Sequence, residues 1–181
     1  MKTYIAMLRG INVSGRKKIK MADLRAHLAE LDWQDVSTYI QSGNIVFRAE
    51  SATKSLLAKA IANKIREKYE FDVPVLVKTQ ADLERVVNEN PFPEADGYDS
   101  KYLHVTFLAK APTDAAVETV KAVSHEPEQF IWRGTHLYLY APKGYGRAKL
   151  NNNFLERKLG VQATTRNWKT VNKLLGMAQA A

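Results

Sequence analysis

One order of elements occurs twice along the chain, and this repetition is the feature that most constrains the fold. The first half alternates runs in which apolar residues recur with strand-like or helix-like spacing. In order, the runs predict a strand over 3–9, a helix over 20–32, a hairpin over 36–49, a helix over 53–69 and a strand over 71–78. Gly43 lies between the two β-rich parts of the hairpin run, where a tight turn needs glycine. The first half is therefore predicted to have the order βαββαβ.

The second half repeats this order. It predicts a strand over 101–109, a helix over 112–123, a hairpin over 129–141, a helix over 150–160 and a strand over 161–166. Gly134 takes the place of Gly43 in the second hairpin, and Gly160 is expected to end the second helix. The fold class is therefore α+β, with duplicated ferredoxin-like halves, each an antiparallel or mixed sheet with helices on one face. A further helix over 167–178 follows the last strand.

The junction between the halves lies near Pro91 and Gly97. A linking helix is predicted to run through Val87, and the proline and glycine residues that follow interrupt regular structure. The predicted domains are residues 1–90, with the linking helix, and residues 98–181, with the C-terminal helix.

The chain of 181 residues contains no cysteine. Disulfides, cysteine nucleophiles and thiolate metal sites are therefore excluded. The four histidines are scattered without metal-ligand spacing, so neither a metal nor a cofactor is predicted. We expect a cytoplasmic protein without a membrane segment, because no signal-peptide pattern occurs and no apolar stretch approaches the roughly 18 residues that a spanning helix needs. The oligomeric state is not indicated.

Positive charge is concentrated in two segments. The formal net charge is +8. Residues 9–20 contain five basic side chains and no acidic one, and residues 143–173 contain eight basic side chains and one acidic one. Such clusters favour a polyanionic partner or a phosphorylated ligand, although charged runs also occur simply as solvated surface.

The basic segment "RGINVSGRKKIK", residues 9–20, partly matches a P-loop, with Gly10, Gly15 and Arg16 in the expected order. The hydroxyl residue that would hold magnesium is missing, the helix is predicted to begin only near Lys20, and the next strands form a hairpin. These differences argue against a nucleotide hydrolase. Two interpretations stay open: a loop that wraps an anion with backbone donors and cations, and a long flexible connection between a strand and a helix.

Two further segments near the C-terminus combine amide, hydroxyl and cationic groups. In "GYGRAKLNNNF" at 144–154, Arg147 and Lys149 are followed by three asparagines, 151–153, that open a predicted helix, although a helix cap needs only one asparagine. "TTRN" at 164–167 precedes the C-terminal helix, where free N–H groups and an arginine suit an anion. Each segment also has a purely structural interpretation as a helix cap.

Base stacking on the first sheet, as in RNA recognition motifs, is a weaker alternative. It would use Tyr4 and Phe47 on neighbouring strands, but the glycine and aromatic spacing of that motif is absent.

Three stretches, at residues 4–28, 38–47 and 150–175, closely resemble the bacterial family called domain of unknown function 1697 (DUF1697). The resemblance covers essentially the whole chain. It implies a cytoplasmic α+β protein with two ferredoxin-like halves, and it implies no activity. The family usually has glycine at the position of Ser14 and lysine at the position of Arg16. Because serine replaces glycine in this chain, we do not expect position 14 to require a positive φ.

The leading hypothesis is a binding protein rather than an enzyme. Its two basic segments would converge on one surface that binds nucleic acid or a phosphorylated small molecule. The alternative is an enzyme acting on a small phosphorylated or nucleoside substrate, whose catalytic residues the sequence does not identify. The predicted ligand-binding residues are Arg9, Asn12, Gly15, Arg16, Lys17, Lys18, Gln41, Asn44, Lys149, Asn151, Asn152, Thr165, Arg166 and Asn167.

Overall fold

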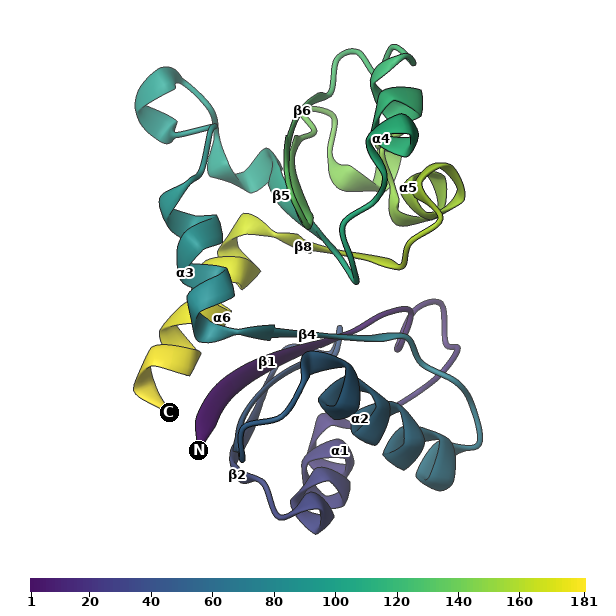
Figure 1. Ribbon diagram of the computed structural model, residues 1–181, viewed down its shortest axis with the longest axis vertical. Helices are drawn as coiled ribbons and strands as arrows, with labels where there is room; N and C mark the ends of the chain where they lie inside the picture. Colours follow the sequence, from purple (N-terminus) through teal and green to yellow (C-terminus); the bar gives the residue numbers. More distant parts are fainter. The chain divides into compact units, whose positions relative to one another are not determined.

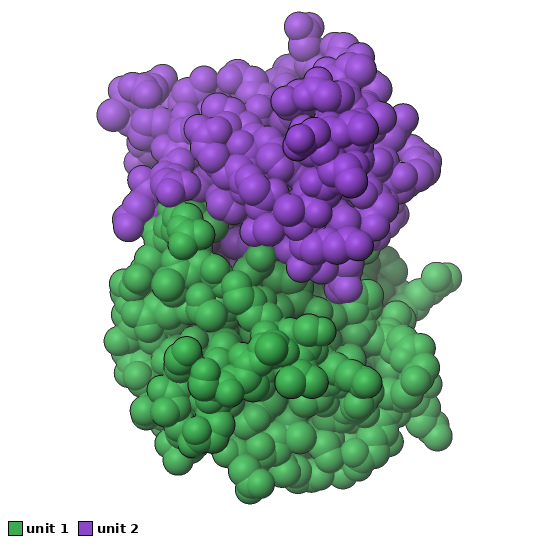
Figure 2. All heavy atoms as spheres, viewed as in Figure 1, with its two compact units in different colours: residues 1–86, 173–181 green, residues 87–172 purple.

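The structure, a computed structural model, describes residues 1–181. The chain forms two compact units (Figure 2). The first consists of residues 1–86 together with 173–181, and the second of residues 87–172. Each unit contains a four-stranded antiparallel sheet with helices, so the predicted α+β class is confirmed.

The first sheet has the strand order β2-β3-β1-β4, and all neighbouring strands are antiparallel. Its elements are β1 (Lys2–Leu8), α1 (Met21–Leu28), the 3₁₀ helix η1 (Ala29–Leu31), β2 (Gln34–Tyr39), β3 (Asn44–Ala49), α2 (Lys54–Tyr69) and β4 (Val75–Thr79). The predicted last strand of this half began too early, at residue 71. Pro74 lacks an N–H group for the ladder, and its carbonyl accepts a hydrogen bond from the backbone N–H of Arg9 at 3.0 Å.

The core of the first unit lies between the sheet and the helices α1 and α2, which cover the same face of the sheet (Figure 1). Alternate residues of β1 and β3 point into this core, as the period of two in a strand requires. Leu57, Ile61 and Ile65 of α2 are spaced four residues apart and form its buried face.

Tyr4 and Phe47 are part of this core. Their exposed fractions are 2% and 0%, and their ring centroids lie 5.7 Å apart. The ring of Phe47 also stacks on Trp33 at 4.1 Å. The RNA-recognition-motif alternative is therefore wrong, since both rings face the helices instead of an open sheet surface.

The second sheet repeats the order of the first as β6-β7-β5-β8, again with antiparallel neighbours. Its strands are β5 (Leu103–Leu108), β6 (Gln129–Arg133), β7 (His136–Tyr140) and β8 (Ala163–Asn167). The remaining helices of the whole chain are α3 (Gln80–Asn88), η2 (Glu94–Asp96), η3 (Ser100–Tyr102), α4 (Asp114–Lys121), η4 (Tyr145–Arg147), α5 (Asn152–Leu159) and α6 (Trp168–Ala180). The two sheet-and-helix halves fit a duplication.

Helices α4 and α5 cover one face of the second sheet (Figure 1), where Leu137, Leu139 and Leu155 form part of the core. Asn151 caps α5 and Gly160 ends it with a φ of 64°, as predicted. Helix α4 begins two residues after the predicted start at Pro112, because the hydroxyl of Thr113 accepts the backbone N–H of Ala116 and caps the helix there.

The last nine residues of the chain belong to the first unit. In this segment Leu174, Leu175 and Ala178 are buried, and the side-chain amide of Gln179 donates to the Glu84 carboxylate of α3 at 3.4 Å. The predicted domains, 1–90 and 98–181, stay a prediction. None of the helices combines the length and apolar composition needed to cross a bilayer.

Candidate functional site

The basic loop, residues 9–20, connects β1 to α1 and has a defined hydrogen-bonded structure. The backbone N–H of Asn12 donates to the carbonyl of Lys17 at 3.2 Å, and that of Arg16 donates to the carbonyl of Val13 at 3.0 Å. Ser14 and Gly15, at the two central positions of this turn, have φ values of 50° and 75°. Positive φ at both positions is the geometry of a type I′ hairpin turn. The middle of the loop is therefore a small hairpin.

Asn12 ties this hairpin to the rest of the first unit. Its side-chain amide donates to the carbonyl of Ile19 at 2.9 Å and to the carbonyl of Gln41 at 2.8 Å, and its Oδ1 accepts the backbone N–H of Ile19 at 2.9 Å. Ile11 and Ile19 on either side are 2% and 1% exposed. Asn12 thus positions the loop against the β2–β3 turn, and its contact with a ligand stays a prediction.

We expect Asn12→Ala to lower the free energy of unfolding by about 2–3 kcal/mol, because three hydrogen bonds worth about 1 kcal/mol each are lost. Urea unfolding measures this effect. The control is Gln41→Ala, whose exposed side chain makes no hydrogen bond while its backbone carbonyl remains. Equal stability of the two variants would contradict the role given to Asn12.

Backbone strain is concentrated around the same place. Of the seven non-glycine residues with positive φ, four are Asn12, Ser14, Lys17 and Ile40, in the loop and the adjoining β2–β3 turn. Ile40, a β-branched residue, has a φ of 50° and is 47% exposed. Such conformations persist only where the surrounding structure imposes them, and they gather at functional sites.

Position 14 does adopt a positive φ, so the expectation that it would not require one is wrong. We therefore expect Ser14→Gly to raise the free energy of unfolding by about 1 kcal/mol, since glycine pays no Cβ penalty in this region. Differential scanning calorimetry measures the change. Ser51→Gly, at an exposed position without positive φ, is the control and should not stabilise; a similar gain there would show that the effect is not one of turn geometry.

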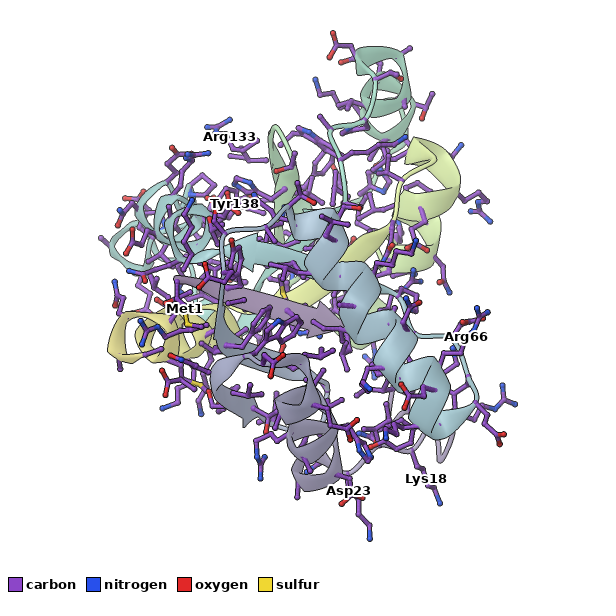
Figure 3. The ribbon with its side chains drawn as sticks, turned by 60° about the horizontal axis from the view of Figure 1, so that its bottom comes forward. Met1, Lys18, Asp23, Arg66, Arg133 and Tyr138 are labelled. Atoms are coloured by element: carbon purple, nitrogen blue, oxygen red, sulfur yellow. The ribbon has the colours of Figure 1, made fainter.

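The cations of the loop differ in their surroundings. Lys17 donates from Nζ to the carbonyl of Asp72 at 2.6 Å, and Arg66 forms a two-pronged ion pair with the carboxylate of Asp72, with both N–O distances 2.9 Å. The side chains of Arg16 and Lys18 are exposed and have neither a hydrogen bond nor an ion pair. Figure 3 shows Lys18 extending outward from the first unit. Arg16 and Lys18 are thus available to an anion.

The β2–β3 turn beside the loop contributes Gln41 and Asn44. Gln41 is exposed, whereas Asn44 is 0% exposed and donates from its amide to the carbonyl of Tyr39 and the hydroxyl of Ser42, both at 3.0 Å. Asn44 therefore holds the turn from inside. Gln41 lies at the surface next to the basic loop.

In the second unit, the structure brings Asn152 and Thr165 together. The hydroxyl of Thr165 donates to Oδ1 of Asn152 at 2.7 Å and lies 2.7 Å from the hydroxyl of Thr106 on the neighbouring strand β5. Asn151 caps α5 through Phe154 at 3.0 Å, and Asn167 accepts the backbone N–H of Thr170 at 2.8 Å in the first turn of α6. These asparagines hold helix ends.

Arg166 is 9% exposed, and one of its guanidinium nitrogens donates to the carbonyl of Thr165 at 3.0 Å. Burial lowers the pKa of Arg166 to about 10, while the neighbouring Tyr145 acts in the opposite direction. Lys149 donates from Nζ to the carbonyl of Glu126 at 3.2 Å. These groups belong to the second unit and the basic loop to the first, so the hypothesis that they share a surface stays a prediction.

Two features were missed from the sequence. Lys78 on β4 is only 7% exposed, and burial lowers its pKa to about 8. Lys143 and Arg147 line a pocket with Glu126 in the second unit. The charges were visible in the sequence, but only the tertiary structure joins segments 126–128 and 141–149.

No group of three or more histidine, aspartate or glutamate side chains is placed to hold a metal ion.

The structure is thus that of an α+β protein with two four-stranded sheets and a hydrogen-bonded basic loop. The chain belongs to the family described as "Protein of unknown function (DUF1697)", whose model matches residues 1–138. It is similar to the solved structure of the conserved bacterial protein SP0830 from Streptococcus pneumoniae, with 24% sequence identity over 98% of each chain and a TM-score of 0.76. That likeness shows the fold alone. Comparison with curated proteins found no match.

Proposed function

We propose that the protein binds nucleic acid through the basic loop of the first unit. The observation that carries this proposal is a largely exposed loop, residues 9–20, which has five cations and no acid and whose central hairpin is held by hydrogen bonds. Phosphate contacts from such cations supply most of the sequence-independent affinity for nucleic acid. A fixed loop also loses little conformational entropy on binding.

Apolar side chains support the choice of nucleic acid over a simple anion. Val13 is 60% exposed at the tip of the loop, and Ile40 is 47% exposed in the adjoining turn. Exposed aliphatic side chains among cations suit the sugar and base surfaces that lie between phosphates. The strained φ of Ile40 supports a functional role for its position.

We also infer that each half is a ferredoxin-like unit and that the chain arose by duplication. The order β2-β3-β1-β4, repeated as β6-β7-β5-β8 with antiparallel neighbours, supports this. A cytoplasmic location is proposed with it, on the absence of cysteine and the family resemblance.

Fluorescence anisotropy with labelled single-stranded DNA, double-stranded DNA and RNA tests the binding proposal. Titrations at about 50 and about 200 mM salt should show affinity falling steeply as salt rises. The double variant Arg16→Ala/Lys18→Ala should weaken binding by about tenfold and reduce the slope of log K against log salt by about 2.

The control variant is Lys59→Ala/Lys158→Ala, which removes the same charge from two exposed positions without partners. Its affinity should stay close to that of the parent chain. Absent or salt-independent binding would overturn the proposal, and so would an equal loss in both double variants, because the effect would then come from net charge alone.

The alternative is a protein, binding or catalytic, for a small phosphorylated or nucleoside ligand. The observation that favours it is the cationic pocket of the second unit.

A further inference from the structure

The second unit contains a pocket of about 220 Å³ between the segment that leads into β6 and the segment that follows β7. It is smaller than the pockets of about 300–1,000 Å³ that hold drug-sized ligands, so it suits a small molecule. Its wall consists of Glu126, Pro127, Glu128, Ala141, Lys143, Gly144, Arg147, Ala148 and Lys149.

Three cationic side chains line this pocket. The side chains of Lys143 and Arg147 are exposed and have neither a hydrogen bond nor an ion pair. Lys149 is held at the wall by its hydrogen bond to the carbonyl of Glu126 at 3.2 Å, which leaves its charge unneutralised by any carboxylate. The lining thus offers three positive groups, one of them an arginine that can bind two phosphate oxygens at once.

The two glutamates of the wall have different roles. The carboxylate of Glu128 accepts the backbone N–H of Lys149 at 2.7 Å and that of Leu150 at 3.0 Å, so it fixes the 149–150 backbone and is already satisfied. Glu126 is exposed, and its carboxylate pairs with no cation. Its carboxylate is therefore available as a hydrogen-bond acceptor beside the cations.

Gly144 sets the path of the chain between Lys143 and Arg147. Its φ of 85° and ψ of 147° belong to a region that only glycine occupies readily. Its N–H donates to the carbonyl of Ala141 at 2.8 Å, and its carbonyl accepts the N–H of Arg147 at 3.1 Å. This turn presents both cationic side chains to the same pocket.

We propose that this pocket binds a sugar phosphate. The phosphate lies against Lys143, Arg147 and Lys149, and a sugar hydroxyl donates to the free carboxylate of Glu126. A carboxylate next to three cations would weaken the binding of a bare anion. It strengthens the binding of a ligand that carries hydroxyl donors beside its phosphate, because a hydroxyl can donate to it. The pocket uses none of the residues of the basic loop, so this proposal stands apart from nucleic-acid binding.

Isothermal titration calorimetry of the full chain with ribose 5-phosphate, inorganic phosphate and ribose tests the proposal. Ribose 5-phosphate should bind most tightly, inorganic phosphate more weakly and ribose not measurably. ¹H–¹⁵N spectra should show the ligand-induced shifts in residues 126–128 and 141–149. Shifts elsewhere only, or no binding of ribose 5-phosphate, would overturn the proposal.

Three variants make the test specific. Arg147→Ala should weaken ribose 5-phosphate binding by about tenfold or more. Glu126→Gln should remove the preference for ribose 5-phosphate over phosphate, whereas Lys158→Ala, an exposed cation of the same unit, should change nothing. An Arg147→Ala variant that folds normally by circular dichroism and still binds as the parent chain does would refute the site.

The Arg16→Ala/Lys18→Ala variant separates the two proposals. It should bind ribose 5-phosphate like the parent chain, because its changes lie in the first unit. A loss of sugar-phosphate binding in that variant would contradict the assignment of the ligand to this pocket.

Discussion

Gly43→Ala is expected to lower the free energy of unfolding by about 3–4 kcal/mol, the sum of a positive-φ penalty and overpacking. Gly43 has a φ of 81°, and a Cβ added there would lie 2.7 Å from Cβ of Leu8 and 2.7 Å from Cδ1 of Ile11. The Cβ of Leu8 moves only with its backbone, whose N–H donates to the carbonyl of Gly43 at 2.8 Å. The clash therefore disturbs β1 itself.

Gly134→Ala is the matched control, since Gly134 turns the second hairpin. It has a φ of 52° and no atom within 4 Å of an added Cβ, so only the torsional cost of about 1 kcal/mol remains. Hydrogen exchange followed by mass spectrometry resolves the two units: Gly43→Ala should increase exchange in residues 1–86, and Gly134→Ala only modestly in residues 129–141. Equal losses of stability would mean that the close approach to Leu8 does not matter.

Lys78→Met is expected to raise the free energy of unfolding near neutral pH by up to about 3 kcal/mol. Burial lowers the pKa of Lys78 from 10.5 to about 8. The charge of Asp82 acts against this lowering of the pKa, and the charge of Lys54 adds to it. Below pH 8 both the folded and the unfolded chain carry the proton, so the full cost of burying the charge is present. Between pH 8 and 10.5 the unfolded chain binds more protons, and the stability of the parent chain rises with pH.

Chemical unfolding of both proteins at several pH values measures this difference. The advantage of Lys78→Met should be largest near pH 7 and should shrink as pH rises through 8 toward 10.5. Lys59→Met, at an exposed position whose side chain has no partner, is the control for adding an apolar side chain and should give no such gain in stability. A difference between Lys78→Met and the parent chain that does not vary with pH would show that the charge of Lys78 is not responsible.

The order of elements was predictable because it depends on local signals. Gly43 and Gly134 turn the two hairpins, apolar residues at spacings of two or of three and four distinguish strands from helices, and Asn151 caps α5 where expected. The start of β4 was wrong, since the apolar run before Pro74 looked like strand. The limits of the two units were harder to predict from the sequence, because the packing of residues 173–181 depends on contacts between distant parts of the chain.

The candidate site was predictable only in part. The concentration of cations in residues 9–20 is visible in the sequence, but the hydrogen bonds of Asn12 to Ile19 and Gln41 follow from tertiary structure. The strained Ile40 carries no sequence signal, because isoleucine in a β-rich run favours extended backbone. The pocket around Arg147 was not predictable from the sequence, because it forms only where Glu126, about twenty positions earlier in the chain, lies in the same wall.

The membership of residues 173–181 in the first unit has a consequence for synthesis on the ribosome. Residues 1–86 emerge early, yet the segment that completes their unit is translated 87 residues later. At about 5–20 residues per second this interval lasts roughly 4–17 s. During that time residues 1–86 lack the buried side chains of Leu174, Leu175 and Ala178. A nascent chain halted midway is therefore the form most exposed to aggregation and to chaperones.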